Sequence, residues 1–381
     1  MPKVYIKTFG CQMNLRDSEV VAGLLEKSGY KLTDTPEKAY IVIFNTCSVR
    51  QHAEDKVWSE IGRFAKLKTK PLIGLIGCMA QNYKAGVFQR APAVDFAVGP
   101  ADIDKIPEII KQVTGGSRQG AGGKLYQRKI WETEGRLRPE EIYHTGFHQD
   151  KKHAYVVISE GCVNFCSYCV VPYTRGPLRH RKPADIVREI ETAVKKGITK
   201  ITLLGQNVNA YNCGGVNFVN LVNCVNLVKG LKEFSFITSH PKDTSVELFQ
   251  AMASADKLKK YLHLPIQSGS DRMLKLMNRG YTVKYYLDLA DKYRKIVKPG
   301  QLTTDIIVGF PGETQNDFQD TYDLVKKVKF DSGFIFKYSP RPNTAALKYK
   351  DDVSKEEKER RHQLILNLQK KISKKHAKDK S

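Results

Sequence analysis

The segment Tyr155-Val156-Val157-Ile158-Ser159-Glu160-Gly161-Cys162-Val163-Asn164-Phe165-Cys166-Ser167-Tyr168-Cys169 joins an apolar run to three closely spaced cysteines. The apolar run predicts a buried strand, and the C-x3-C-x2-C spacing places three thiols in the tight loop that follows it. A cubic iron–sulfur cluster held by three thiolates leaves one iron open for a small chelating ligand. The sequence therefore predicts such a cluster at Cys162, Cys166 and Cys169.

Zinc is the alternative at this loop. A structural zinc ion takes four ligands, usually from paired C-x2-C arms, and the loop has only three cysteines. His180 or His153 could supply the fourth ligand, so the residues alone leave zinc open.

Beyond the cysteine loop, strand-like and helical segments alternate. Helical spacing is clearest in 184–196, where Ile186, Ile190 and Val194 recur at four-residue intervals. Six βα units are too few for a closed eight-stranded barrel and favour an open (β/α)6 partial barrel. The six expected strands are 155–158, 201–204, 234–238, 261–264, 304–308 and 333–337.

The N-terminal part also reads as βαβ units, with expected strands at 4–6, 40–44 and 72–76. Cys11, Cys47 and Cys78 each follow the carboxyl end of one of these strands. In open α/β sheets those ends converge on the ligand-binding crevice, so three distant thiols can meet there. A second metal site is the preferred interpretation, and three small buried apolar residues are the alternative. Cys213 and Cys224 match no pattern and are read as ordinary small apolar residues.

Composition indicates the compartment and the class of partner. The 381 residues include 63 Lys and Arg against 40 Asp and Glu, a formal charge of +23, which favours a polyanionic partner such as nucleic acid. A Lys-rich composition with solvated basic faces is the alternative. The chain shows no export signal and no apolar stretch of roughly 18 residues, so we expect a cytoplasmic protein without a membrane span. We also expect a monomer.

The carboxyl ends of the expected barrel strands are polar and rich in glycine. Small residues let a ligand approach the backbone, and amides and hydroxyls supply directed hydrogen bonds, so these ends predict a cofactor cavity. His263, inside an apolar strand, is read as a core histidine, and Glu313 as either a ligand contact or a helix N-terminal charge. The segments are Gly205-Gln206-Asn207, Ser239-His240-Pro241, Gln267-Ser268-Gly269-Ser270 and Gly309-Phe310-Pro311-Gly312-Glu313.

Several motifs in order along the chain resemble the radical S-adenosylmethionine methylthiotransferases. The resemblance is most specific for the branch that makes tRNA 2-methylthio-isopentenyladenosine, and it covers nearly the whole chain. The motifs are Phe9-Gly10-Cys11-Gln12-Met13-Asn14, Asn45-Thr46-Cys47, Gly77-Cys78-Met79-Ala80-Gln81, 161–176, Thr238-Ser239-His240-Pro241, 262–271, Met277-Asn278-Arg279-Gly280-Tyr281-Thr282 and 305–313.

The resemblance implies two [4Fe-4S] clusters and S-adenosylmethionine as cofactors. Cys162, Cys166 and Cys169 would hold the cluster that cleaves S-adenosylmethionine to a 5′-deoxyadenosyl radical. Cys11, Cys47 and Cys78 would hold an auxiliary cluster that carries the sulfur to be inserted at C2 of N6-isopentenyladenosine, next to the anticodon. The residues expected in the cofactor pocket are Gly205, Gln206, Asn207, Ser239, Gln267 and Ser268.

The partners that the resemblance implies are tRNA, an electron donor such as flavodoxin or ferredoxin, and a sulfur donor that the sequence does not identify. Stacking and phosphate contacts to tRNA are expected from Tyr173, Arg175, Arg179 and Arg181, which follow the cluster loop. Other branches of the family modify threonylcarbamoyladenosine in tRNA or an aspartate of a ribosomal protein, and these are the alternative substrates. A non-catalytic, metal-stabilised RNA-binding protein is the alternative from another class.

The expected organisation has four parts. An N-terminal domain with the auxiliary cluster (1–115) is followed by a linker (116–147), the radical S-adenosylmethionine core (148–345) and a basic helical tail (346–381). Family members usually end in a β-barrel RNA-binding domain, and that domain is expected to be absent here because the sequence stops where it would begin.

Overall fold

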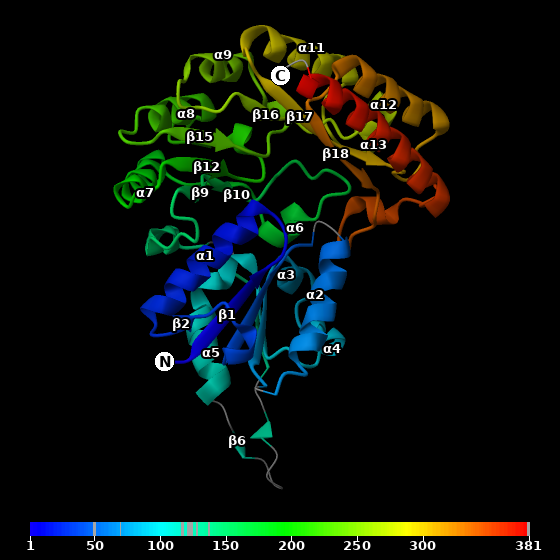
Figure 1. Cartoon of the computed structure of the whole chain (residues 1–381). Helices are drawn as coiled ribbons and strands as arrows, with labels where there is room; N and C mark the ends of the chain where they lie inside the picture. The colour runs from blue at the N-terminus through cyan, green and yellow to red at the C-terminus, as the bar shows by residue number, and fades with distance from the viewer. Residues whose placement is uncertain are drawn as a thin grey trace. The chain divides into compact units, whose positions relative to one another are not determined.

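A computed structural model of the chain describes residues 1–48, 51–68, 70–115, 118–119, 125–126, 129–135 and 138–378. Two compact units are formed: residues 1–151 together with 173–176, and residues 152–172 together with 177–381 (Figure 1). Both are α/β structures built on parallel strands, as the alternating pattern predicts.

The first unit is a six-stranded parallel sheet in the order β2-β1-β3-β4-β5-β8. The three strands expected from apolar runs are confirmed as β1, β3 and β4, which lie side by side in the centre of the sheet. The strands are β1 (Lys3–Thr8), β2 (Lys31–Leu32), β3 (Ile41–Thr46), β4 (Leu72–Gly77), β5 (Phe96–Val98) and β8 (Ile130–Glu132).

Helices cover both faces of this sheet, with α1 and α5 on one face and α2, α3 and α4 on the other (Figure 1). On the second face, Phe44 of β3 packs edge-on against Phe64 of α2, with ring centroids 5.3 Å apart. The helices are α1 (Gln12–Lys27), α2 (Gln51–Phe64), α3 (Cys78–Tyr83), α4 (Gly86–Arg90) and α5 (Ile106–Gly115). A short antiparallel pair, β6 (Arg118–Gln119) and β7 (Leu125–Tyr126), follows α5.

The second unit is the open partial barrel. Its parallel strands fall into two groups of three, β15-β12-β9 and β16-β17-β18. A parallel bridge between Phe234 and Leu258 continues the hydrogen bonding across the gap between the groups. All six expected strands are confirmed, as β9 (His153–Val157), β12 (Lys200–Leu204), β15 (Glu233–Phe236), β16 (Tyr261–His263), β17 (Gln301–Val308) and β18 (Ser332–Lys337).

Helices line the outside of these strands, and one continuous apolar core fills the space between the layers. The helices are α7 (Pro183–Lys195), α8 (Phe218–Asn226), α9 (Val246–Ser254), α10 (Asp271–Leu276), α11 (Val283–Ile296), α12 (Gln315–Val328) and α13 (Lys355–Lys378). The short helix α6 (Val171–Arg175) follows the cysteine loop, and its residues from Tyr173 onward belong to the first unit. Two antiparallel pairs, β10 (Ser159–Glu160) with β11 (Arg179–His180) and β13 (Asn212–Cys213) with β14 (Val216–Asn217), complete the unit.

The C-terminal segment is helical over Lys355–Lys378, as expected for the tail, and it packs on the barrel. Ile365 of α13 is fully buried, and Leu368 and Ile372 pack against the same core. Among the described residues, no helix combines the length and the apolarity needed to cross a bilayer.

Candidate metal centres

The three N-terminal cysteines lie past the carboxyl ends of adjacent strands of the first unit. Cys11 precedes α1, Cys47 follows β3, and Cys78 is the first residue of α3. Because β3 pairs in parallel with both β1 and β4, these strand ends lie next to one another along one edge of the sheet. The fold therefore brings three residues that are far apart in sequence to a common edge.

Two glycines make this close approach of the backbone possible. A Cβ on Gly10 would lie 2.4 Å from Cβ of Cys47, and a Cβ on Gly77 would lie 2.6 Å from the carbonyl oxygen of Thr46. Gly77 also has φ of +90°, a backbone conformation that side chains with a Cβ rarely adopt. A glycine is thus required immediately before Cys11 and immediately before Cys78.

A buried pair of asparagines fixes the geometry around the cysteines. Nδ2 of Asn14 donates to Oδ1 of Asn45 and to the carbonyl oxygen of Thr46, both at 2.9 Å. In return, Nδ2 of Asn45 donates to the carbonyl oxygen of Asn14 at 2.8 Å. Oδ1 of Asn14 accepts from Sγ of Cys11 at 3.3 Å. The asparagines therefore join the start of α1 to the end of β3 and hold Cys11 against that junction.

The Cys11 and Cys47 thiols are hydrogen-bonded to each other. A hydrogen bond with Cys47 and the positive charge of Arg175 outweigh burial and lower the pKa of the Cys11 thiol to about 6. A thiol with a lowered pKa is a thiolate at neutral pH, and the thiolate is the form that binds metal. Arg175 is held in place by Asp17 of α1, whose Oδ2 lies 2.8 Å from Nη2 of the arginine.

The cysteine loop of the second unit is anchored by backbone contacts to the segment around Met277. The Ser167 amide donates to the Met277 carbonyl oxygen at 3.0 Å, and Oγ of Ser167 donates to the Leu276 carbonyl oxygen at 2.8 Å. Nδ2 of Asn278 donates to the carbonyl oxygens of Asn164 and Phe165 at 3.1 and 3.0 Å. Phe165 has φ of +45°, so these two bonds help to hold the loop in a sparsely populated backbone conformation.

Arg279 is the buried cation of this loop. Its Nη1 donates to Sγ of Cys166 and to the hydroxyl of Tyr168, each at 3.3 Å, and its Nη2 donates to the Pro265 carbonyl oxygen at 3.0 Å. Only 5% of the residue is exposed. Arg279 therefore joins the Cys166 sulfur to the Tyr168 hydroxyl and the Pro265 carbonyl oxygen and places a positive charge beside a candidate cluster ligand.

Burial raises the pKa of the Cys162 thiol, and burial together with the neighbouring Cys166 raises the pKa of Cys169 to about 12. Without a bound metal these two thiols keep their protons, and metal coordination would release them. Among the described residues, no three His, Cys, Asp or Glu side chains are grouped closely enough to hold one metal ion. Each set of three cysteines supplies the donors of a [4Fe-4S] cluster with one open iron, so the two sets fit a cluster in donor chemistry.

The two histidines proposed as a fourth zinc ligand differ in position: His180 belongs to β11, which pairs with β10 just before the cysteine loop, whereas His153 lies away from it. His153 lies at the start of β9, at the opposite end of that strand from the cysteine loop, and its Nε2 lies 2.9 Å from Oγ1 of Thr202. His180 packs edge-on against Tyr211, with ring centroids 5.3 Å apart. His153 therefore cannot be the fourth ligand of a zinc ion bound at the cysteine loop, and this form of the zinc alternative is wrong.

Comparison with known proteins identifies both units. Residues 3–99 match the uncharacterized protein family UPF0004, and residues 156–325 match the radical SAM superfamily. A tRNA-2-methylthio-N(6)-dimethylallyladenosine synthase of Carboxydothermus hydrogenoformans is 42% identical over 97% of this chain and 83% of the relative. Synthases of the same name from Geobacter sulfurreducens and Desulforamulus reducens are 43% and 44% identical, over 96% and 97% of this chain and 81% of each relative. The chain belongs to this synthase family.

The resemblance read from the motifs is thereby confirmed, and the chain is an enzyme of the radical SAM superfamily. Solved structures agree on the fold. The radical S-adenosylmethionine methyltransferase TsrM of Kitasatospora setae superposes with a TM-score of 0.62 over 91% of this chain and 75% of its own, at 15% identity. The cobalamin-dependent radical enzyme OxsB gives a TM-score of 0.55 over 98% of this chain and 56% of its own, at 12% identity.

The residues expected in the cofactor pocket follow the carboxyl ends of β12, β15 and β16. Gly205 lies against Ser159, because a Cβ on this glycine would be 2.4 Å from the serine Oγ. Oγ of Ser239 and Oδ1 of Asn207 are buried atoms without a hydrogen-bond partner among the described residues. Such orphaned polar atoms fit a bound polar ligand, since burial without a partner costs free energy.

The other three pocket residues differ in their contacts. Oε1 of Gln206 accepts from the amide of Gly161, beside the cysteine loop. Gln267 has φ of +74° and forms a bridge to Ile306 of β17. Oγ of Ser268, in contrast, lies 3.3 Å from Oγ1 of Thr321 on α12. The side chain of Ser268 thus supports the loop from its helix side.

The four residues expected to contact RNA differ in their exposure to solvent. Tyr173 is 45% exposed, and Arg179 pairs with Glu160 at 3.1 Å with a fifth of its side chain exposed. Arg181 is buried and pairs with Glu189 of α7 at 2.6 Å. Arg175, also buried, pairs with Asp17. Because their guanidinium groups are enclosed and paired within the protein, Arg175 and Arg181 serve the fold in this conformation.

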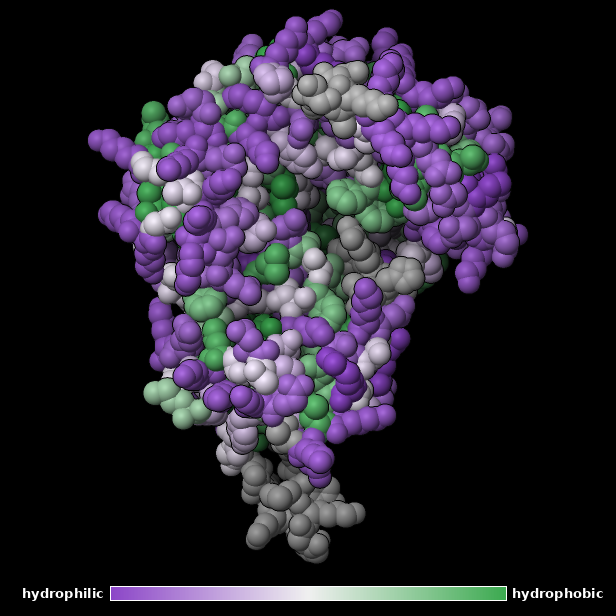
Figure 2. Space-filling model, in the orientation of Figure 1, coloured by the Kyte–Doolittle hydropathy of each residue, from purple (hydrophilic) through white to green (hydrophobic). Residues whose placement is uncertain are grey.

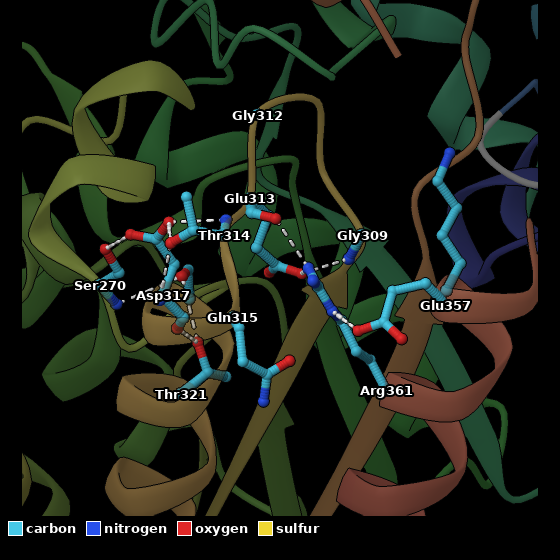
Figure 3. Close-up of polar contacts among 12 residues, drawn as sticks. Ser270, Gly309, Gly312, Glu313, Thr314, Gln315, Asp317, Thr321, Glu357 and Arg361 are labelled. Carbon is cyan, nitrogen blue, oxygen red and sulfur yellow. Dashed lines mark hydrogen bonds and ion pairs between the residues drawn. The ribbon is translucent and has the colours of Figure 1, made fainter. Parts of the chain in front are cut away.

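Glu313 belongs to a buried polar network that joins α13 to the end of β17 (Figure 3). Its Oε2 accepts from Nη1 of Arg361 at 2.6 Å and from the amide of Gly309 at 2.7 Å. Arg361 also pairs with Glu357 one helical turn earlier. Burial raises the pKa of Glu313 in spite of its arginine partner. The described contacts of Glu313 are with the protein itself, so a structural role explains its position better than the helix dipole alone.

Sequence reasoning missed the charged residues that support the cysteines. Arg279 stands inside a recognised motif, but nothing in its neighbours indicates that it reaches Cys166, 113 positions earlier. Arg138 lies inside the region expected to be a linker (116–147), and its Nη1 binds Oδ1 of Asp17 at 2.8 Å inside the first unit. For both Arg279 and Arg138, the sequence shows no more than an arginine next to a turn.

Proposed function

We propose that this enzyme transfers a methylthio group to C2 of N6-isopentenyladenosine next to the anticodon of tRNA. The observation that carries the proposal is the identity of 42–44% to synthases named for this product, over nearly the whole chain. The positions of two three-cysteine sets at strand ends support the same reaction, because three thiolates leave one iron of a cluster open.

The first cofactor site uses Cys162, Cys166 and Cys169. A reduced [4Fe-4S] cluster bound there would supply the electron that cleaves S-adenosylmethionine. Arg279 would hydrogen-bond the Cys166 ligand, and Asn278 would hold the loop backbone. The residues proposed to bind S-adenosylmethionine are Gly205, Gln206, Asn207, Ser239 and Gln267, with Ser268 assigned to supporting the loop.

The second cofactor site lies in the first unit. Cys11, Cys47 and Cys78 would hold an auxiliary [4Fe-4S] cluster that carries the sulfur to be transferred. The contact between the Cys11 and Cys47 thiols and the lowered pKa of Cys11 support it, as does the steric need for glycine beside Cys11 and Cys78. Here Asn14 and Asn45 would position the ligands.

We further propose that Tyr173 and Arg179 contact the RNA near the target base, the tyrosine by stacking and the arginine through a phosphate. A small protein electron donor of the flavodoxin or ferredoxin type would reduce the first cluster. The alternative substrates within the family are threonylcarbamoyladenosine in tRNA and a ribosomal protein aspartate, and a non-catalytic metal-stabilised RNA-binding protein is the alternative of another class.

The test is nucleoside mass spectrometry of tRNA from a host that lacks its own methylthiotransferases. Expression of the wild-type chain should produce 2-methylthio-isopentenyladenosine, and Cys166→Ala and Cys47→Ala should each abolish it. Cys224→Ala is the matched control, because Cys224 is exposed and lies outside both sets, and it should leave the product unchanged.

Each alternative has its own signature in this experiment. Methylthiolated threonylcarbamoyladenosine would assign the enzyme to the neighbouring branch of the family. A methylthio-aspartate in a ribosomal protein would show that the substrate is a protein and not tRNA. Iron and sulfide bound at all six cysteines without any methylthio product would favour the non-catalytic protein. Full activity of Cys47→Ala would remove the auxiliary cluster from the mechanism.

A further inference from the structure

The positive charge of the second unit is concentrated at one end of its strands. All six strands run in parallel, so the connections that enter them from a preceding helix lie at their amino-terminal end. Five connecting segments and the last turns of α13 hold eighteen Lys or Arg and three Asp or Glu. We call these segments the basic end face: 195–200, 229–233, 256–260, 294–299, 326–331 and 370–376.

Contacts along α13 place its C-terminal turns on this face. Arg361, near the start of the helix, pairs with Glu313 after the carboxyl end of β17. Oγ of Ser373, three turns later, donates to the carbonyl oxygen of Asp331, just before β18 begins. The helix therefore runs from the carboxyl end of the strands to their amino end. Its last turns lie beside the other lysines of the face and carry Lys370, Lys371, Lys374 and Lys375.

Helix capping accounts for only some of these cations. Positive side chains are favoured at helix C-termini because they offset the negative end of the dipole. Nζ of Lys257 does so by donating to the Val228 carbonyl oxygen at 2.9 Å, and Nη2 of Arg294 does so by donating to the Lys329 carbonyl oxygen at 2.8 Å. In contrast, Lys295, Lys327, Lys371 and Lys374 are exposed to solvent, from the ends of three successive helices.

The chemistry of the face narrows the class of partner. Lysine is a point charge that suits phosphate groups and does not read bases in a fixed geometry. A redox protein would have to approach the cysteine loop, which lies at the carboxyl end of the strands, and an eight-residue strand spans roughly 25 Å. An amphipathic membrane site needs several exposed apolar side chains among its cations; Leu227 beside segment 229–233 is 78% exposed, but Ile372 of α13 packs against the core.

We propose that the basic end face binds the phosphate backbone of RNA, without base recognition. This site is separate from the one that modifies the nucleoside. In Figure 2, hydrophilic side chains predominate on the visible surface of α11 and along α13. Because it needs neither cluster, RNA binding at this face can be tested independently of the proposed methylthio transfer.

The experiment measures binding of a fluorescently labelled, unmodified tRNA transcript and of a random-sequence RNA by anisotropy, over a range of salt concentrations. The face variant carries Lys295→Gln, Lys327→Gln, Lys371→Gln and Lys374→Gln. The control variant removes four exposed lysines of the first unit through Lys27→Gln, Lys31→Gln, Lys38→Gln and Lys66→Gln.

The face variant should bind both RNAs at least about tenfold more weakly at about 0.1 M salt, and the slope of log affinity against log salt should be shallower by about 3. The control variant should stay within about twofold of wild type. Equal losses in the two variants, no loss in either, or no RNA binding by the wild type would overturn the proposal. Face-dependent binding to phosphatidylserine vesicles but not to RNA would assign the face to a membrane and would also overturn it.

Discussion

Asp17 and Arg175, 158 positions apart in sequence, form a buried ion pair at 2.8 Å, with 2% and 4% of their side chains exposed. The second carboxylate oxygen of Asp17 binds Arg138 at the same distance. One carboxylate thus neutralises two arginines inside the first unit. Arg175 in turn contributes to the lowered pKa of Cys11, so this pairing connects the packing of the unit to a candidate cluster ligand.

Replacement of Asp17 by Asn should destabilise the first unit by about 3–5 kcal/mol, because two buried guanidinium groups would lose their counter-charge. Urea unfolding followed by circular dichroism measures the change. Asp34→Asn, at an exposed position, is the control and should change the free energy of unfolding by less than about 0.5 kcal/mol. Equal effects of the two substitutions would contradict the assignment.

The same carboxylate should give the stability a dependence on acid pH. Burial alone would raise the pKa of Asp17, but Arg138 and Arg175 outweigh it and lower the pKa below its ordinary value. A carboxyl with a lowered pKa in the folded state contributes stability above its unfolded pKa of about 3.9, and that contribution is lost as the pH falls through the folded value. Unfolding free energies measured from about pH 6 to about pH 3 should therefore fall more steeply for wild type than for Asp17→Asn. Parallel curves would remove Asp17 as the source.

Gly77→Ala should destabilise the first unit by about 2–4 kcal/mol, because the new Cβ would meet the Thr46 carbonyl oxygen in a positive-φ conformation. It should also lower the iron bound next to Cys78 in reconstituted protein. Gly62→Ala is the control: a Cβ there meets no atom within 4 Å, and alanine inside α2 should stabilise by up to about 1 kcal/mol. Retention of full stability and full iron by Gly77→Ala would contradict the steric argument.

Arg279→Lys should reduce the iron and sulfide retained by the second unit. Lysine cannot bond Cys166, Tyr168 and Pro265 at once, and the lost hydrogen bonds should also cost about 2 kcal/mol. Arg272→Lys tests the specificity of the effect, because the Arg272 side chain is 51% exposed. Iron and sulfide analysis after anaerobic reconstitution gives the readout, and a loss as large in Arg272→Lys would show that the effect is not local.

The pair Glu313–Arg361 should show strong coupling in a double-mutant cycle. Glu313→Gln and Arg361→Met alone should each cost about 3–5 kcal/mol, and the double variant should cost clearly less than the sum. The exposed pair Lys337–Glu359 provides the comparison and should couple by less than about 1 kcal/mol. Additive losses at Glu313 and Arg361 would mean that α13 docks mainly through its apolar side chains.

Local sequence pattern predicted nine of the parallel strands, because each is a short apolar run between turn residues, but it missed β2, β5 and β8, which have only two or three residues. It also predicted that Cys11, Cys47 and Cys78 would lie at strand ends, since parallel pairing places all carboxyl ends on one edge. What it could not predict were contacts between polar residues distant in sequence. Asp17 looks like any other helical acidic residue, and Arg138 like any other loop arginine, until the chain is folded.

The expected RNA contacts show that the sequence also does not reveal which charged side chains are buried. A run with Arg175, Arg179 and Arg181 has the composition of a basic binding loop, yet in the folded chain Arg175 and Arg181 are enclosed by carboxylate partners. Composition reports charge, whereas burial decides whether that charge is available to a ligand.

The path of α13 along the barrel has a consequence for self-association. β18 is the last strand of its sheet, and a strand in that position offers unpaired carbonyl and amide groups to any other strand. His362 lies 3.1 Å from the Ile335 carbonyl oxygen, and Gln369 donates to that of Phe330 at 2.8 Å. The helix thereby occupies acceptors along and beside this edge, and a chain that ended before Lys355 would present them to a second copy as a template for intermolecular sheet growth.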